Sequence, residues 1–296
     1  MKKIYFAPNW GYSSERMVED YIKQTPADSG IWENITHTNN LKEADYLVIQ
    51  DNCPPDLFNY FEKSKRLYFS REAMTPNVIN NFPKESVVRN SFWDNTNILW
   101  TKWWYPNKSS GGIGLSYDYL IDEKPINKNK LLSCIQSDKM LTKGHVLRHN
   151  FLRNLISVYP DEIDLYGSIR FANKKLKNND KTHGLDPYKY CLAFDNQDNI
   201  RNFFGTQFTD AILRWTVPIY WGGADLDKYF PEKSFIKIDL NKNHKHIIEQ
   251  VMEIIDEDDY DDRIDSLKEA RNRILNNYNM WPVLKKEIDR LELGDS

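Results

Sequence analysis

Polar side chains directly follow several apolar runs of this 296-residue chain. The run Tyr190–Phe194 ends in Asp195-Asn196, and the run Val217–Trp221 ends in two glycines. Between them lie a loop through Gly205 and a segment with apolar residues at helical spacing. Strands that end in polar residues and lead into helix N-termini build the ligand sites of open α/β sheets. This region is therefore the leading candidate for a site that hydrogen-bonds a polar ligand.

A further carboxylate, Glu72, follows the apolar run Leu67–Ser70 in the same way. A carboxylate at the end of a strand is well placed to take a proton from a hydroxyl group. The alternative interpretation is a surface glutamate in a turn beside Arg71.

Basic side chains lie where they would meet an anionic ligand. Arg148 lies near the start of a helix expected at 144–158, beside Lys143, and Arg170 follows a strand expected at 163–166. Arginine binds phosphate through two parallel hydrogen bonds, and helix N-terminal amides add to such a site. The alternatives are an ordinary basic helix face for Arg148 and a solvated loop for Arg170. We expect the basic run Asn173–Lys181 to be a solvated loop, with a phosphate-facing role as the alternative.

Strand and helix patterns alternate along the chain, which predicts α/β layers. The expected strands are 3–7, 45–50, 66–70, 97–104, 131–136, 163–166, 190–194, 217–221 and 234–239. The expected helices are 14–25, 55–65, 144–158, 208–215, 245–255, 262–276 and 282–293. The stretch 109–130 is rich in Gly, Ser, Pro and Lys and is the best linker candidate. This order predicts two Rossmann-like units, with a single doubly wound sheet as the alternative.

Composition restricts the class of protein. A net charge of −3 with a pI near 6.1 argues against a dedicated nucleic-acid binder. The three cysteines, Cys53, Cys134 and Cys191, form no CxxC pair, which predicts buried free thiols in a reducing compartment. The sequence shows no signal peptide and no membrane anchor. We expect a cytoplasmic protein of bacterial or viral type, either dissolved or peripheral to a membrane.

The block from Tyr188 to Gly223 resembles the signature of the α1,3/4-fucosyltransferases, glycosyltransferase family 10. In that family a strand YKF-x-LAFEN is followed by Thr-Glu-Lys, a helix and VPI-YWG. This chain has YKYCLAFDN at 188–196 and VPIYWG at 217–222. The resemblance implies a GT-B fold, in which two Rossmann-like domains face a cleft. It also implies inverting transfer of fucose from GDP-fucose to a hydroxyl of a glycan, with no further cofactor.

The resemblance divides the chain into an acceptor-side domain at 1–125, a donor-binding domain at 126–278 and a C-terminal helix at 279–296. It makes Glu72 the general base, and it places Arg148 and Arg170 at the donor diphosphate. Asp195 and Asn196 then hydrogen-bond donor hydroxyls or the guanine edge. Two aromatic residues of the first half, Trp103 and Trp104, are weak candidates for an acceptor platform, with core packing as the alternative.

The chain departs from the family at Thr206-Gln207-Phe208, where the Glu and Lys of the family motif are absent. Thr206 and Gln207 remain candidates for the donor site, since an amide can bind a hydroxyl or a phosphate oxygen. A missing lysine removes one charge-assisted phosphate contact. Two alternatives to a GDP-fucose transferase therefore stay open: transfer of another nucleotide sugar, and an inert relative that binds a glycan or a nucleotide.

Two short patterns are typical of metal sites elsewhere. Asp225-Leu226-Asp227 spells DxD, and His145 and His149 are four residues apart on an expected helix. DxD is too short to be specific, and the two histidines have no evident third ligand. We assign no metal and expect both histidines to be solvated.

Overall fold

The computed structural model describes residues 1–9, 11–50, 52–69, 115–177, 180–201 and 203–294. The chain divides into two compact units. The described residues before 70, the segment 115–122 and the C-terminal segment from Leu275 form the first unit. The segment 123–274 forms the second.

The first unit is built on a five-stranded sheet in the order β2-β3-β1-β4-β5. Its strands are β1 (Lys2–Phe6), β2 (Ile31–Trp32), β3 (Ile35–His37), β4 (Tyr46–Gln50) and β5 (Arg66–Phe69). All neighbours are parallel except β2 and β3. Parallel strands with helical crossovers are the Rossmann arrangement that the sequence predicted.

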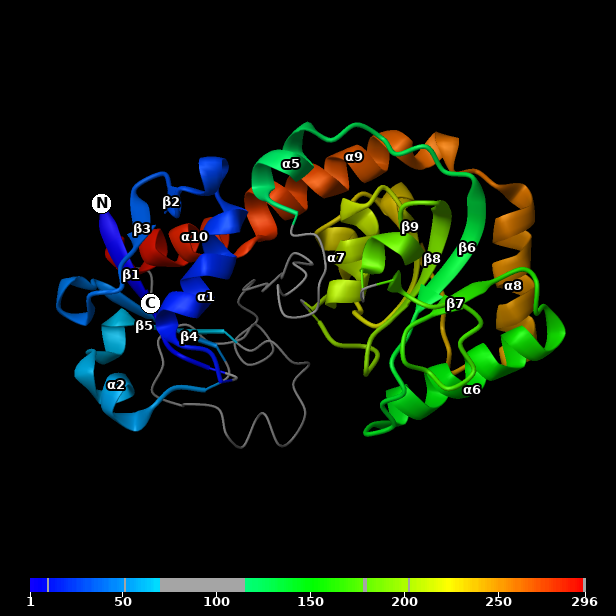
Figure 1. Cartoon of the computed structure of the whole chain (residues 1–296), viewed down its shortest axis with the longest axis horizontal. Helices are drawn as coiled ribbons and strands as arrows, with labels where there is room; N and C mark the ends of the chain where they lie inside the picture. The colour runs from blue at the N-terminus through cyan, green and yellow to red at the C-terminus, as the bar shows by residue number, and fades with distance from the viewer. Residues whose placement is uncertain (10, 51, 70–114, 178–179, 202, 295–296) are drawn as a thin grey trace. The chain divides into compact units, whose positions relative to one another are not determined.

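Helices cover both faces of this first sheet. Residues of α1 (Ser14–Tyr21) and of α10 (Met280–Glu292) pack with Phe6 and Val48 in one core cluster. On the other face, Leu47 and Ile49 pack with residues of α2 (Pro55–Tyr60). Neighbouring residues of β4 thus serve opposite faces, as the two-residue period of a strand requires. Figure 1 shows α10, at the C-terminal end of the chain, beside the N-terminal strands.

The second unit has a five-stranded sheet in the order β10-β9-β8-β6-β7, and every pair is parallel. Its strands are β6 (Lys130–Ile135), β7 (Asp164–Tyr166), β8 (Tyr188–Phe194), β9 (Val217–Trp221) and β10 (Ile236–Lys237). Every residue of β9 is buried, and so is every residue of β8 except Lys189. Near-continuous apolar strands are typical of parallel sheets covered on both faces.

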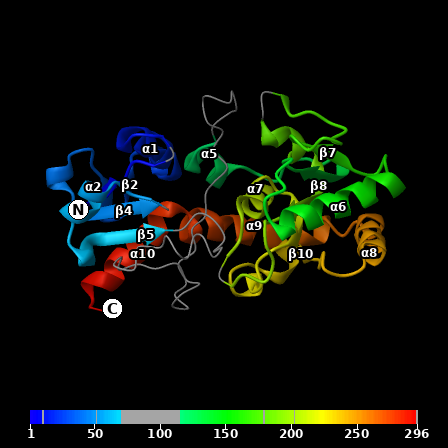
Figure 2. The same ribbon diagram turned by 90° about the horizontal axis from the view of Figure 1, so that it is seen from below.

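Two helix pairs cover this second sheet. On one face, Phe151 of α6 (Lys143–Val158) packs edge-on against Phe194 of β8 and His244 of α8 (His244–Glu257). On the other, Phe208 of α7 (Thr206–Leu213) packs against Tyr220 of β9. Helix α7 also contacts α9 (Ile264–Arg273), which leads through a π-helical turn at Ile274–Tyr278 toward α10. Figure 2 shows α6 and α8 together on one side of this unit.

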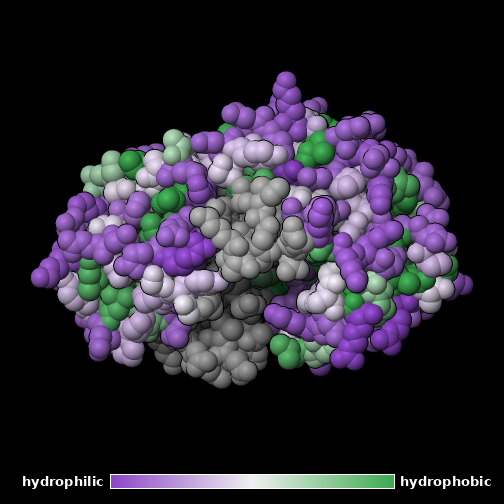
Figure 3. Space-filling model, in the orientation of Figure 1, coloured by the Kyte–Doolittle hydropathy of each residue, from purple (hydrophilic) through white to green (hydrophobic). Residues whose placement is uncertain are grey.

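Hydrophilic residues predominate on the visible described surface (Figure 3), consistent with a mean hydropathy of −0.69. Within the described residues, no helix combines the length and the apolar character that crossing a membrane requires. Short 3-10 turns complete the secondary structure, among them η7 (Lys181–Gly184), which leads into β8.

Candidate active site

The carboxyl ends of β6, β8 and β9 meet at one edge of the second sheet. Asp195 and Asn196 follow β8, and Gln136 follows β6. The backbone N–H of Asp195 donates to the carbonyl of Trp221 at 3.0 Å, which ties this end of β8 to the end of β9. The polar side chains predicted from the strand ends therefore do gather at one edge, where open parallel sheets bind ligands.

Asp195 is buried and helps to shape the loops at this edge. Its carboxylate accepts a hydrogen bond from the Tyr220 hydroxyl, which in turn accepts the N–H of Gly223 at 2.9 Å. Burial, and then the neighbouring Asp195, raise the pKa of Tyr220 well above its ordinary value, so the hydroxyl keeps its proton. A Cβ on Gly205 would overlap the Asp195 carboxylate, so a side chain before α7 would displace that carboxylate.

Arg148 is the centre of a buried hydrogen-bond network. The residue is only 3% exposed, and burial lowers the pKa of its guanidinium from the ordinary value. Nη1 donates to the carbonyls of Phe194 and Asp195 at 3.2 and 3.3 Å and to Oδ1 of Asn196 at 3.0 Å. With the Gln136 amide oriented to satisfy its neighbours, its oxygen accepts from Nη2 at 2.8 Å and from Nε at 2.9 Å. One guanidinium thus joins the ends of β6 and β8 and fixes the side chain of Asn196.

The first turn of α6 packs on the same loop. The Thr142 hydroxyl donates to the carbonyl of Asn196 at 2.9 Å. Thr142 also caps the helix, because its side chain accepts the N–H of His145 while the His145 ring accepts the N–H of Thr142. A Cβ on Gly144 would overlap the Asn196 carbonyl, so glycine permits this close approach. Burial, with a smaller contribution from Arg148, lowers the pKa of His145 to about 4.

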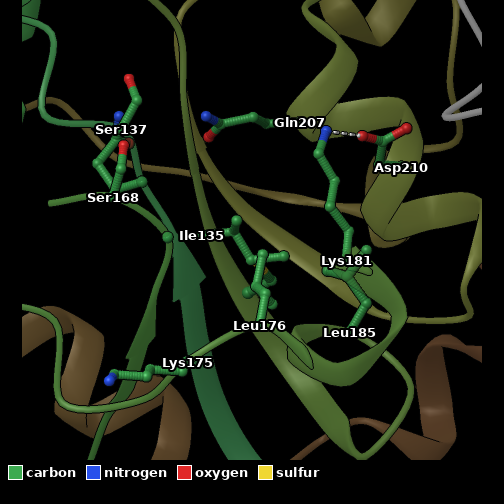
Figure 4. Close-up of a pocket in the computed structure, with 12 residues that line it drawn as sticks. Ile135, Ser137, Ser168, Lys175, Leu176, Lys181, Leu185, Gln207 and Asp210 are labelled. Atoms are coloured by element: carbon green, nitrogen blue, oxygen red, sulfur yellow. Dashed lines mark hydrogen bonds and ion pairs between the residues drawn. The ribbon is translucent and has the colours of Figure 1, made fainter. Parts of the chain in front are cut away.

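A pocket of about 480 Å³ opens beside this edge (Figure 4). Ile135, Leu176 and Leu185 line its apolar part. Its polar part includes Ser137 after β6, Ser168 after β7 and Gln207 in the first turn of α7. A concave site with an apolar wall and a few polar groups suits a small organic ligand with both kinds of surface.

Residues 126–263 match the model of the C-terminal domain of glycosyltransferase family 10 (fucosyltransferase). This segment is a family 10 domain. The family predicted from the block 188–223 is therefore confirmed, and the edge and pocket described above lie within the matched residues.

Relatives outside this chain agree with that assignment. Over 106 residues the chain is 31% identical to the alpha-(1,3)-fucosyltransferase FucT of Helicobacter pylori, a match over 36% of this chain and 21% of that protein. The chain therefore spans about a fifth of the length of this curated relative.

Solved structures match over more of the chain. A crystal structure of an alpha1,3-fucosyltransferase matches with a TM-score of 0.52 at 19% identity, over 89% of this chain and 80% of that one. A structure of an alpha1,3-fucosyltransferase with GDP matches with a TM-score of 0.51, at 19% identity over 90% and 81% of the two chains. The predicted α/β fold of GT-B type is confirmed.

Two further predicted residues of the family 10 domain lie at the start of α7. Thr206 is exposed at the first helical position, and Gln207 lines the pocket. The Gln207 Oε1 accepts the backbone N–H of Phe194 at 3.2 Å. The structure therefore brings Gln207, Asp195 and Asn196 to the same sheet edge.

Arg170 is placed differently from Arg148. Its side chain is 88% exposed, and its Nε donates to Asp138 Oδ2 at 2.8 Å. It follows Gly167, whose φ of +103° favours glycine and whose Cβ would overlap the backbone of Gln136. The turn after β7 thus packs on the end of β6 and carries an exposed guanidinium near the pocket.

Three predicted residues, Glu72, Trp103 and Trp104, lie outside the described part of the chain, as does the strand expected at 97–104. Their roles stay predictions.

The short metal-like patterns have other partners. Asp225 pairs with Lys228 at 3.1 Å, and Asp227 pairs with Lys237. The expectation of solvated histidines was wrong, because both are buried: His145 caps α6, and His149 donates from Nε2 to the Ser137 carbonyl at 3.0 Å. Among the described residues, no three His, Cys, Asp or Glu side chains are grouped to hold a metal ion.

Sequence reasoning missed one ion pair of the pocket wall. Lys181 of η7 meets Asp210 of α7, with 2.7 Å between Nζ and Oδ2. The only sequence signal was the basic run ending at Lys181, for which we preferred a solvated loop.

Proposed function

We propose that this protein is an inverting glycosyltransferase that moves fucose from GDP-fucose to a hydroxyl of a glycan. The observation that carries the proposal is the pocket at the carboxyl edge of the parallel sheet in a family 10 domain. In this assignment residues 126–278 bind the donor, residues 1–125 bind the acceptor, and 279–296 is the C-terminal helix.

The pocket's chemistry supports a nucleotide donor. The apolar wall at Ile135, Leu176 and Leu185 suits a flat base, while the hydroxyls of Ser137 and Ser168 suit a ribose or a phosphate oxygen. Arg170 offers an exposed guanidinium for the diphosphate. Thr206 and Gln207 lie at the start of α7, where backbone N–H groups favour an anion.

Asn196 binds a donor hydroxyl in this proposal. Its Oδ1 already accepts from Arg148, which leaves the side-chain NH₂ as the group presented to a ligand. Arg148 and Asp195 then hold the loops at this sheet edge in place, since both are buried and hydrogen-bonded to neighbouring loops and strands. They are positioning residues rather than direct donor contacts.

Glu72 is the proposed general base. An acceptor hydroxyl that attacks the anomeric carbon opposite the leaving GDP must lose its proton to a base beside it, while cationic groups and amides stabilise the negative charge on GDP. Glu72 has this role through its resemblance to the family motif. Trp103 and Trp104 remain proposals for acceptor contact.

The decisive experiment measures transfer and hydrolysis of GDP-fucose by the full chain and by Glu72→Gln. We expect the variant to lose about a hundredfold to ten-thousandfold in rate while its affinity for GDP stays within about threefold. Glu62→Gln, an exposed carboxylate of the first unit, is the control and should keep the full rate. A near wild-type rate for Glu72→Gln removes Glu72 from the mechanism, and absence of turnover by the wild type favours an inert binding protein.

A second candidate is transfer of another nucleotide sugar, because Thr206-Gln207-Phe208 lacks the Glu and Lys of the family. A thermal-shift panel of GDP, GDP-fucose and GDP-mannose against UDP, CMP and dTDP compounds separates the two. Ligands that bind the native state raise its melting temperature. A shift confined to a non-guanine nucleotide would overturn fucose as the donor sugar and keep the transferase.

We propose that the reaction takes place in the cytoplasm. Cys53, Cys134 and Cys191 are all free thiols, which suits a reducing compartment.

A further inference from the structure

The pocket has two chemically distinct ends. Figure 4 shows Ser137, Ser168, Gln207 and the Lys181 ammonium toward one end, with Leu176 and Leu185 toward the other. A ligand with a flat, weakly polar part and an anionic part would match this division. The anionic part would lie at the end that carries the hydroxyls, the amide and the ammonium.

Lys181 is held in place at that end by a buried carboxylate. Its Nζ lies 2.7 Å from Asp210 Oδ2, and the Asp210 side chain is only 3% exposed. The Lys181 side chain keeps 27% of its surface accessible. Asp210 follows Gln207 by one helical turn on α7, so the helix that presents Gln207 also fixes the position of Lys181.

The charges that line the pocket favour an anion. Lys175 and Lys181 contribute two positive charges and Asp210 one negative charge, a net of +1. The first turn of α7 adds none, because Thr206-Gln207-Phe208 contains no basic residue. Among the described residues that line this pocket, both cations therefore belong to the segment between β7 and β8.

We propose that Lys181 is the cation that binds the phosphate groups of the nucleotide donor. The proposal rests on the proposed function and adds a residue outside the block 188–223. The ammonium donates a charge-assisted hydrogen bond to a diphosphate oxygen and stabilises the charge that develops on the leaving GDP. Asp210 acts as its positioning residue.

A lysine of the same basic run outside the pocket lining provides a matched control. Lys177 is exposed and is not among the residues that line the pocket. Lys177→Met and Lys181→Met therefore remove the same charge from the same run, once outside the pocket and once within it.

The experiment is calorimetric titration of the full chain with GDP, GMP and guanosine. We expect Lys181→Met to weaken GDP binding about tenfold to a hundredfold, the effect of losing a hydrogen bond to a charged group, with guanosine binding changed by less than about threefold. Lys177→Met should change GDP affinity by less than about threefold. The largest loss should be seen with GDP and the smallest with guanosine.

A double variant separates ligand binding from structure. Lys181→Met leaves the Asp210 carboxylate buried without this partner, which is expected to lower the melting temperature. Lys181→Met/Asp210→Asn removes that charge as well, so we expect it to recover thermal stability but not GDP affinity. Wild-type affinity for GDP in the double variant, or equal losses in Lys177→Met and Lys181→Met, would overturn the role of Lys181.

Failure of the donor assignment gives a different result. If the wild type binds UDP and not GDP, then GDP-fucose is not the donor. Titrating the same variants with UDP, UMP and uridine then tests whether Lys181 binds the phosphate groups. If the wild type binds no nucleoside diphosphate, both proposals are overturned.

Discussion

Two arginine sites of the second unit make opposite use of the same side chain. Arg148, on α6, is 3% exposed and donates to three residues at the end of β8 and to Gln136 after β6. Arg170, on the turn after β7, has an 88% exposed side chain and forms an ion pair with Asp138. Resemblance to the family assigned both to the donor diphosphate. The structure separates a guanidinium committed to protein acceptors from one that a ligand can reach.

The difference lies in what surrounds each side chain. Strand ends leave carbonyl groups that need donors, and a buried arginine supplies up to five N–H groups in a fixed plane. At an exposed turn the same group competes with water, so its ion pair contributes at most about 1 kcal/mol. Arg148 is thus expected to matter first for stability and Arg170 first for binding.

The largest expected effect is that of Arg148→Met on stability. Loss of the guanidinium leaves the carbonyls of Phe194 and Asp195 and the Gln136 amide without these donors, at a cost of about 3 kcal/mol or more. Urea denaturation measures the change. Arg153→Met, at an exposed position of the same helix, is the control and should cost less than about 1 kcal/mol. Equal losses in the two variants would contradict a structural role specific to Arg148.

Gly144→Ala tests the packing of α6, the helix that carries the buried Arg148. Alanine normally stabilises a helix interior by about 1 kcal/mol relative to glycine. Here the added Cβ would overlap the Asn196 carbonyl, so we expect stability to fall by about 1 to 3 kcal/mol. Urea denaturation measures the change in stability. A gain in stability would show that α6 does not depend on this close approach.

The stability of the buried region around Arg148 should also fall in acid, because His145 titrates there. Its folded-state pKa of about 4 is below the ordinary 6.5, so the unfolded chain binds the proton more readily between these values. Stability is therefore fully present above pH 6.5 and is lost as the pH falls toward 4. Between pH 6.5 and 5.5 the loss from this group is at most about 1.4 kcal/mol.

His145→Gln is the matched variant for that pH effect. Glutamine at this position of a capping box can accept the N–H of Thr142 without titrating. The slope of unfolding free energy against pH between 6.5 and 5.5 should be smaller in the variant. An unchanged slope would assign the acid sensitivity to other groups.

The smallest expected effect on stability is that of Arg170→Met, below about 1 kcal/mol. If Arg170 binds the diphosphate, the same variant should raise the KM for the donor about tenfold, with kcat little changed. Arg170→Lys keeps the charge but loses the planar pair of donors, so it should recover part of that loss. A KM equal to that of the wild type would leave Arg170 as a solvated loop residue.

The apolar runs and caps of the sequence predicted most of the elements. The helix expected at 144–158 is α6 at Lys143–Val158, and the run expected at 217–221 is β9 at Val217–Trp221. The helix expected at 14–25 ends earlier, at Tyr21, where a 3-10 turn follows. The strand pair β2 and β3 was missed because segments of two and three residues give no periodic signal.

The site was predictable where it depends on strand ends, and less so where it depends on loops. Asp195, Asn196 and Gln207 lie at the predicted edge because each is tied by sequence to an end of a strand or helix. The Lys181–Asp210 pair joins residues 29 apart, and only the folded path of the loop brings them together. The sequence also did not show that Arg148 points inward. A basic residue on a helix is usually exposed, and the buried acceptors of Arg148 are known only from the structure.

The C-terminal helix α10 has a consequence for synthesis on the ribosome. Met280, Trp281, Leu284 and Ile288 complete the core cluster that includes Ile4, Phe6 and Val48, so the first and last parts of the chain share one core. The N-terminal strands therefore leave the exit tunnel long before the helix that covers one of their faces has been translated. That face stays exposed to chaperones, or to aggregation, until α10 has been made and can pack on it.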